Sequence, residues 1–259
     1  MIQSPRMKKF LKSYLNNRPF FYVFIRPREL GLFEKRLPFK KPILDFGCGD
    51  GFFAKVLFGN SRIDVGIDVD KTVLHEAKES RVYRRVLTYD GVSIPFNGEE
   101  FSTVFSNCVM EHVDNLNLSL NEISRVMKKG GKFYVSVMTD MWESYLIGAK
   151  FLGKRYAQWL KKIQKHPNLL SVDGWKKAFK EAGFEVVEQI GYLGKNDSHL
   201  LELSHYLSVD SLISKRLFDR WVLFPGGFSL LEKYLLRFCK KAVTDQDNSA
   251  AVFFTLRKI

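Results

Sequence analysis

Three glycines, each separated by one residue, follow a short apolar run early in the chain. The run at 42–46 reads PILDF, the loop at 47–51 reads GCGDG, and the apolar residues of 51–58 recur at helical spacing. Glycine lets a backbone turn tightly and lets a ligand approach it without a Cβ clash. A helix that starts directly after the loop offers free N–H groups and the positive end of its dipole. This glycine loop therefore predicts a ligand site where a strand gives way to a helix.

The residues around the glycine loop distinguish two classes of ligand. The dinucleotide fingerprint G-x-G-x-x-G requires a third glycine at the position of Phe52. Asp45 and Asp50 place carboxylates at the loop. These would repel a pyrophosphate but suit a ligand with an ammonium and a sulfonium, as in S-adenosylmethionine (SAM).

Two further acids stand at the ends of the next two predicted strands. Asp68 follows the run at 62–67, and Asp90 follows the run at 84–89. A carboxylate roughly twenty residues past the glycines can accept from both hydroxyls of a ribose. An acid one strand further along would reach an adenine amino group. The loop and the two acids together indicate a nucleoside cofactor far more specifically than the loop alone.

Short apolar runs alternate with helical patterns along most of the chain. Strands are predicted at 42–46, 62–67, 84–89, 101–107, 132–138, 183–192 and 250–258. Helices are predicted at 51–58, 71–80, 116–129 and 172–182, with Gly130 and Gly131 as the C-cap of the third. This order predicts βαβ units, and hence a parallel sheet with helices on both faces.

The stretch 43–138 resembles the class I SAM-dependent methyltransferases, especially the group related to ubiquinone and menaquinone biosynthesis enzymes. The segments that carry the resemblance are LDFGCGDG, GIDVD, YDGVSIPF, FSNCVMEHV and ISRVMKKGGKFYVSV. One departure is Ser102, where the family usually has Asp. The resemblance implies an α/β, Rossmann-like sheet of seven strands, mostly parallel with the last antiparallel, and SAM as the cofactor. Helical additions are expected at the N-terminus and between the last two strands.

The resemblance also implies roles for individual residues. The glycine loop would contact the methionine part of SAM, Asp68 would hold the ribose with Val69 beside the adenine, and Asp90 would bind the adenine amino group. Asn107 would border the methyl-transfer site. The full set of expected cofactor-binding residues is Asp45, Gly47, Cys48, Gly49, Asp68, Val69, Asp90, Gly91 and Asn107.

Two histidines and a tryptophan are the candidates for acceptor chemistry. Methyl transfer from a sulfonium is a direct displacement, which needs alignment, a dry site and, for a hydroxyl acceptor, a base. His112 is the candidate catalytic base, with packing or capping as its alternative role. His166 and Trp142 are candidate substrate residues, although His166 would also suit a surface loop. We expect no metal site, because no further His or acid stands at ligand spacing.

The chain divides into two predicted regions. Residues 1–41 form a basic, aromatic and partly helical extension, interrupted by prolines. Residues 42–259 form the methyltransferase domain. Within that domain, 139–170 is the predicted lid or substrate region, and 195–249 is a helical insertion that exceeds the family's usual length.

Composition constrains the location and the partners of the protein. The 259 residues carry a formal net charge of +13, and a surface of this sign attracts polyanions, unless it only keeps the protein soluble. Three cysteines without a C-x-x-C pair indicate a reducing compartment. The beginning of the chain has no signal-peptide pattern and no apolar run long enough for a bilayer span. We therefore expect a cytoplasmic protein, or one peripheral at the inner membrane face.

The favoured function is methyl transfer to a small-molecule, lipid or lipid-linked saccharide acceptor, at oxygen or nitrogen. The charge alone suggests RNA as an alternative, but the fourth strand ends in SNCVMEH, unlike the Asn-Pro-Pro-Tyr loops of exocyclic-amine methylases. A third hypothesis is that the chain is a non-catalytic, SAM-binding partner subunit. The basic apolar stripe at 230–241 predicts either a packed helix or homodimer contact, or a surface that docks on an anionic membrane.

Overall fold

The computed structural model describes residues 4–241 and 246–259. The predicted extension at 1–41 and the predicted insertion at 195–249 therefore each include a short piece, 1–3 and 242–245, that lies outside the described residues.

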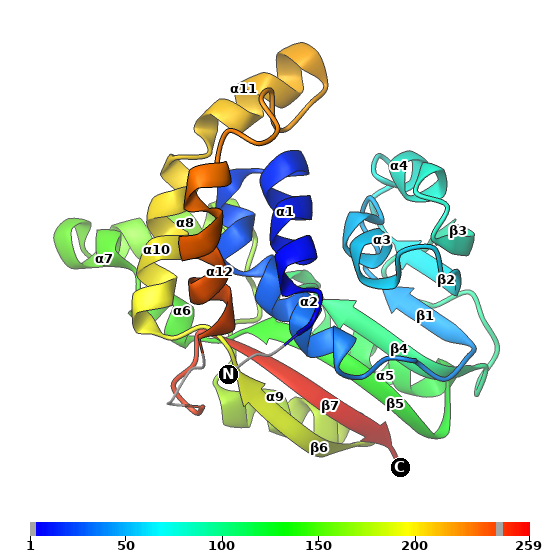
Figure 1. Cartoon of the computed structure of the whole chain (residues 1–259). Helices are drawn as coiled ribbons and strands as arrows, with labels where there is room; N and C mark the ends of the chain where they lie inside the picture. The colour runs from blue at the N-terminus through cyan, green and yellow to red at the C-terminus, as the bar shows by residue number, and fades with distance from the viewer. Residues whose placement is uncertain (1–3, 242–245) are drawn as a thin grey trace.

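Seven strands form one sheet in the order β3-β2-β1-β4-β5-β7-β6 (Figure 1). They are β1 Ile43–Phe46, β2 Ile63–Asp68, β3 Tyr83–Thr88, β4 Phe101–Asn107, β5 Met127–Met138, β6 Phe184–Gly191 and β7 Ala251–Lys258. Strands β1 to β5 pair in parallel, and β7 lies antiparallel between β5 and β6. This confirms the predicted Rossmann-like sheet. Its order reverses between β1 and β4, where open α/β sheets bind their ligands.

Helices cover both faces of the sheet and enclose a hydrophobic core on each (Figure 1). One face carries α1 Met7–Asn17, η1 Phe20–Phe24, α2 Arg26–Glu34, α3 Phe52–Phe58 and α4 Leu74–Glu79. The other face carries α5 Leu116–Val126 and α9 Val172–Glu181. Strands β4 and β7 contribute side chains to both cores, which explains why both strands are buried along most of their length.

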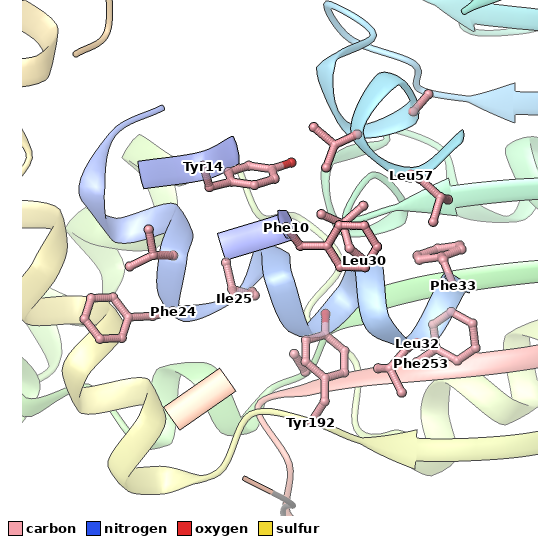
Figure 2. Packing of buried hydrophobic residues seen from close by; sticks show 14 of the residues in the cluster. Phe10, Tyr14, Phe24, Ile25, Leu30, Leu32, Phe33, Leu57, Tyr192 and Phe253 are labelled. Atoms are coloured by element: carbon pink, nitrogen blue, oxygen red, sulfur yellow. The ribbon is translucent and has the colours of Figure 1, made fainter. Parts of the chain in front are cut away.

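The N-terminal helices belong to the core of the sheet. Phe33 of α2 is fully buried, and its ring lies 4.9 Å from Phe253 of β7 and 5.4 Å from Phe53 of α3, measured between centroids. Phe105 of β4 completes the cluster at 5.9 Å. Figure 2 shows Phe33 and Phe253 against each other, with Leu57 of α3 close by. The segment before β1 therefore packs directly on the strands that carry the glycine loop.

One predicted boundary is wrong. The helix expected at 116–129 ends at Val126, and Met127 already pairs with Phe101 in the sheet. Gly130 and Gly131 lie inside β5, so they do not cap the helix. A Cβ on Gly131 would lie 2.8 Å from a backbone oxygen, which only glycine avoids at this irregular strand start.

Additional helices follow β5 and separate β6 from β7. Those after β5 are α6 Met141–Ser144, α7 Ile147–Leu152 and α8 Lys154–Gln164. Those between β6 and β7 are α10 Lys195–Tyr206, α11 Val209–Phe218, η3 Ser229–Leu231 and α12 Glu232–Lys240. A short helix, η2 Met110–His112, follows β4. Helix α12 packs through Leu235 and Cys239, which are buried. None of the helices described at 4–241 and 246–259 has the length and apolar character to cross a membrane.

A buried arginine ties the additional helices to the N-terminal segment. The Arg28 guanidinium donates to Asp197 Oδ2 of α10 at 2.6 Å and to the backbone oxygens of Tyr192 and Phe238 at 2.7 and 2.8 Å. The guanidinium also lies 4.2 Å from the centroid of the Phe238 ring. Breaking a buried pair of this kind leaves an uncompensated charge, so these contacts fix α10 and α12 against α2.

Candidate active site

The glycine loop has the strained backbone that its sequence predicts. Gly47 and Gly51 have φ angles of 76° and 75°, in the left-handed region. A Cβ on Gly47 would lie 2.4 Å from the Val109 side chain. The N–H groups of Gly47 and Cys48 both donate to the Ile67 oxygen at 2.9 Å, which ties the loop to the end of β2. The loop is thus held in place between two strand ends.

A cleft of about 270 Å³, here called the loop cleft, lies over the glycine loop. It brings together five of the predicted cofactor residues, which are Asp45, Gly47, Cys48, Gly49 and Asn107. The other predicted residues, Asp68, Val69, Asp90 and Gly91, stand at or just beyond the ends of β2 and β3 and do not line this cleft. The predicted set therefore separates into a loop group and a strand-end group.

Asp68 connects the two groups. Its Oδ2 accepts from the Gly49 N–H at 2.8 Å, and its Oδ1 accepts from the Asp70 N–H at 3.0 Å. Asp90 holds its own turn, where the N–H groups of Ser93 and Val92 donate to Oδ1 at 2.8 Å and lower the pKa of the carboxyl. Both carboxylates are therefore fixed by backbone donors.

Asp45 lies beneath the loop in a different state. Its side chain is buried, and Oδ2 accepts from the Tyr83 hydroxyl at 2.7 Å. Burial raises the pKa of Asp45 to about 8, against the lowering effect of the Tyr83 hydrogen bond, and the negative Asp68 raises it further. A cationic ligand above the loop would favour the ionised form of Asp45.

The far wall of the loop cleft comes from the N-terminal segment. Arg18 pairs with Asp50 of the loop and lies 4.1 Å from the centroid of the Phe52 ring. Tyr14 meets Phe52 edge-on at 5.2 Å between ring centroids. Sequence reasoning treated these residues as part of a basic, aromatic extension. The alternation of tyrosines and arginines in this segment is the only sequence feature that hints at a binding role. It does not show on which part of the sheet the segment packs.

A buried glutamate of α2 organises the end of β4. Glu29 accepts from Arg26 Nη1 at 2.6 Å, Tyr192 Oη at 2.8 Å and Asn107 Nδ2 at 3.0 Å. It also accepts from Cys108 Sγ at 3.1 Å. The Asn107 Oδ1 accepts from the Ser136 hydroxyl at 2.7 Å. Sequence reasoning missed Glu29, which fixes the amide of Asn107 from one side.

A second pocket of about 240 Å³, the histidine pocket, shares Tyr22 and Arg26 with the loop cleft. It contains all three predicted acceptor-site residues, His112, His166 and Trp142. The Trp142 indole N–H donates to Gln164 Oε1 at 3.0 Å, which orients the ring. The structure therefore brings these three residues together from separate segments of the chain.

Two histidine rings meet in the histidine pocket. The rings of His112 and His166 lie 4.6 Å apart between centroids. His112 Nδ1 donates to the Lys165 carbonyl at 2.9 Å, so Nε2 is the nitrogen left to act as a base. Burial lowers the pKa of His166 to about 3, helped by the charge of His112, and its Nδ1 is buried without a partner.

Glu111 is the most unusual group in this pocket. It is fully buried, and both carboxyl oxygens lack a hydrogen-bond partner. Burial raises the pKa of Glu111, although the nearby charge of His112 lowers it. An unpaired buried polar group is costly, and such groups are often satisfied by a ligand. Within 4–241 and 246–259, no three His, Cys, Asp or Glu side chains are grouped to hold a metal ion.

Comparisons with known proteins find a methyltransferase domain in the chain and methyltransferases among its relatives. A family model described as a methyltransferase domain matches residues 44–135. An uncharacterised protein of Methanocaldococcus jannaschii is 29% identical over 162 residues, covering 62% of this chain and 72% of that protein. The ubiquinone biosynthesis O-methyltransferase of Bartonella quintana is 27% identical over 171 residues, covering 62% of this chain and 68% of that enzyme.

A solved structure has the same fold over almost the whole chain. It is a SAM-dependent methyltransferase of Thermotoga maritima, described as a possible histamine N-methyltransferase, with a TM-score of 0.60, 21% identity and 97% of both chains covered. The matched domain runs from β1 to β5 and contains the glycine loop and the acids at the next strand ends. Residues 44–135 therefore form a SAM-dependent methyltransferase domain, whose cofactor is SAM.

Proposed function

We propose that this enzyme methylates a hydroxyl group of a small, largely apolar acceptor held in the histidine pocket. The class includes lipids and lipid-linked saccharides whose reacting end fits the pocket. The observation that carries the proposal is that the two hollows are adjacent, since Tyr22 and Arg26 line both. An acceptor in the histidine pocket would therefore lie next to the cofactor.

The side chains of the loop cleft fit SAM. Asp45 and Asp50 offer carboxylates to an ammonium and a sulfonium, and Arg18 offers a cation to a carboxylate. Asp68, held at the end of β2, is placed to accept from ribose hydroxyls. When bound, SAM supplies a methyl group made electrophilic by its sulfonium.

His112 is proposed as the general base. With Nδ1 donating to the Lys165 carbonyl, Nε2 has a lone pair for the proton of the acceptor hydroxyl. That proton moves to Nε2 as the acceptor oxygen forms a bond to the methyl carbon and the carbon–sulfur bond breaks. The neutral His166 and the unpaired Glu111 carboxyl supply hydrogen-bond partners that orient the hydroxyl.

The remaining lining of the pocket is mixed, with apolar side chains beside the polar Arg26 and Gln164. Phe21, Met138, Trp142 and Leu201 face the same space, and His205 stacks on Phe21 at 4.1 Å between ring centroids. Such a lining would exclude water and favour an acceptor with a ring or a hydrocarbon chain. Oxygen as the acceptor atom is supported by the O-methyltransferase name of the Bartonella quintana relative.

A methyl-label partition tests the proposal. The purified enzyme and methyl-labelled SAM are added to a lysate of the source cell, which is then separated into organic, aqueous small-molecule, RNA and protein fractions. Label in the organic or small-molecule fraction that resists mild base supports a hydroxylated acceptor, because a methyl ether resists mild base whereas a methyl ester of a carboxyl group does not. Label confined to RNA or protein would overturn the proposal.

Once an acceptor is found, His112→Ala should lower kcat by about 10²- to 10⁴-fold while SAM affinity stays unchanged, because only the proton transfer is lost. His75→Ala is the matched control, since His75 is exposed on α4 and pairs only with Glu79. Equal kcat values for the two variants would exclude His112 as the base.

A further inference from the structure

Helices α10 and α11 and the turn between them expose several apolar side chains to solvent. Leu207, Leu212 and Leu217 are 70%, 60% and 67% exposed. The inward side is mostly polar, and its buried serines are Ser204, Ser208, Ser211 and Ser214. A helix at a protein surface normally shows the reverse arrangement. Something other than this chain is therefore expected to cover the outward side.

The orientation of α10 is fixed by its inward contacts with the N-terminal segment. The hydroxyls of Ser204 and Ser208 donate to Leu201 O and Ser204 O, each at 2.7 Å. Ser208 Oγ also accepts from the Phe21 N–H at 3.0 Å, and Asp197 is paired with Arg28. The two serine bonds lie within the helical turns, but rotating α10 to bury Leu200 and Leu203 would break the contacts with Phe21 and Arg28. The exposed apolar side is thus a stable feature of the fold.

Helices α7 and α8 extend this apolar surface. Phe151 is 82% exposed and Trp159 is 52% exposed. Tyr156 of α8 contacts the hydroxyl of Tyr206 on α10 and donates to Glu202 Oε1 at 2.7 Å. Tyr156 also lies 5.9 Å from Trp159 between ring centroids. In Figure 1, α8 and α10 lie together on the side of the molecule away from α3 and α4.

Positive charge accompanies the apolar residues. The stretch 150–165, KFLGKRYAQWLKKIQK, holds six cations and no acid. Arg216 on α11 and Arg220 after it are also exposed. Two copies placed face to face would bring two such groups of cations together, which Coulomb repulsion opposes. Apolar side chains among lysines and arginines are instead the pattern of helices that lie in an anionic membrane interface.

We propose that α7, α8, α10 and α11 form one docking face that binds an anionic lipid membrane. The exposed Leu, Ile, Phe and Trp side chains would enter the boundary between headgroups and acyl chains, while the lysines and arginines contact lipid phosphates. The histidine pocket opens close to this face, since His205 of α10 and Gln164 of α8 line it. If the proposed function holds, docking would bring a lipid acceptor to the pocket.

Vesicle cosedimentation tests the docking face with the full chain. The vesicles are pure phosphatidylcholine or a mixture with phosphatidylglycerol at about seven to three. The apolar variant combines Leu212→Ser, Ile213→Ser and Leu217→Ser, and the charge variant combines Lys154→Gln, Arg155→Gln and Lys162→Gln. The matched control combines Lys129→Gln, Lys177→Gln and Lys180→Gln, which are exposed residues of β5 and α9.

The wild type should bind the anionic vesicles and should not bind the neutral ones. Added salt should weaken the binding to anionic vesicles. Each docking variant should bind at least about ten-fold more weakly, because each cation near an anionic surface contributes measurably to binding. The control should stay within about two-fold of the wild type. Unchanged SAM affinity in every variant shows that the fold is retained.

Two outcomes would overturn the proposal. One is wild-type binding that is absent or equal on the two kinds of vesicle. The other is a dimer in analytical ultracentrifugation that the apolar variant abolishes, which would assign the face to a second copy. Methyl transfer to a water-soluble acceptor is measured without vesicles, so failure of docking is distinguishable from failure of the proposed function.

Discussion

Asp68 stabilises the glycine loop and is also the residue that we propose to contact the ribose. Its two oxygens each accept from a backbone N–H, from Gly49 and from Asp70. A carboxylate has further lone pairs, so the same group can accept from ribose hydroxyls without giving up these bonds. The loop and the nucleoside half of the cofactor site are thereby linked through one side chain.

Asp68→Ala should weaken SAM binding ten-fold or more, since a lost charge-assisted hydrogen bond is worth about 1.5–3 kcal/mol. Isothermal titration calorimetry gives the affinity. Asp70→Ala serves as the control, because the Asp70 carboxylate only accepts from the N–H and hydroxyl of Thr72. An unchanged affinity in Asp68→Ala would remove the ribose assignment.

Asp45 should make the stability of the SAM-free enzyme depend on pH. Burial raises its pKa to about 8 in the folded state, whereas an unfolded Asp ionises at about 3.9. Between these values the folded state holds a proton that the unfolded state has lost. The contribution of Asp45 to the free energy of unfolding is therefore full below about pH 4 and is lost as the pH rises to about 8.

Asp45→Asn removes this titration and keeps an oxygen acceptor for the Tyr83 hydroxyl. Relative to the wild type, the variant should gain at least about 1 kcal/mol of stability between pH 5 and pH 8, since each pH unit is worth up to about 1.36 kcal/mol. Urea unfolding at the two pH values measures the difference. A constant difference at both would show that Asp45 is ionised in the folded chain.

At the scale of elements, α1 and α2 form a wall of the site and part of the core together. Arg18 and Arg26 reach the cleft, while Phe33 packs on β4 and β7 from the inward side of α2. Residues that bind and residues that stabilise therefore alternate along one segment. Loss of core packing in α2 should weaken the site and the fold together.

Phe33→Ala should lower the free energy of unfolding by about 3–5 kcal/mol, because it leaves a cavity among buried aromatic rings. Phe151→Ala, at a side chain that is 82% exposed, should change stability by less than about 0.5 kcal/mol. Chemical denaturation followed by circular dichroism compares the two. Similar small losses in both variants would show that α2 is not part of the core.

At the scale of the whole molecule, one sheet joins two cores, and the N-terminal helices share the first of them. The predicted boundary between residues 41 and 42 remains a prediction. Buried residues on both sides of it belong to the same hydrophobic core. A molecule of this construction should unfold in one cooperative transition that the cofactor shifts.

SAM at about 100 times its Kd should add about 2.7 kcal/mol to the free energy of unfolding. For a chain of this size that corresponds to a rise in Tm of roughly 5–11 °C. Scanning calorimetry with and without SAM measures the shift, and Asp68→Ala at the same SAM concentration should show a smaller one. No shift in the wild type would mean that the folded chain does not bind SAM.

The sequence by itself determined the sheet, the glycine loop and the acids at its strand ends. These features are local, because apolar periodicity specifies strands and helices and glycine permits the turn between them. It also singled out His112, His166 and Trp142. The helix end at Val126 was placed too late, because two glycines that serve a strand irregularity also match a C-cap.

Only the tertiary structure decided which distant segments meet. Glu29 is an ordinary acid in the sequence, and its role at Asn107 exists because α2 packs beside the end of β4. The meeting of His112 with His166 depends in the same way on where the loop after α8 folds back. The leucines of α10 and α11 predict helices, but buried polar contacts far from them in sequence fix which side faces outward. Local patterns specify elements, whereas such long-range contacts form only when the elements have packed.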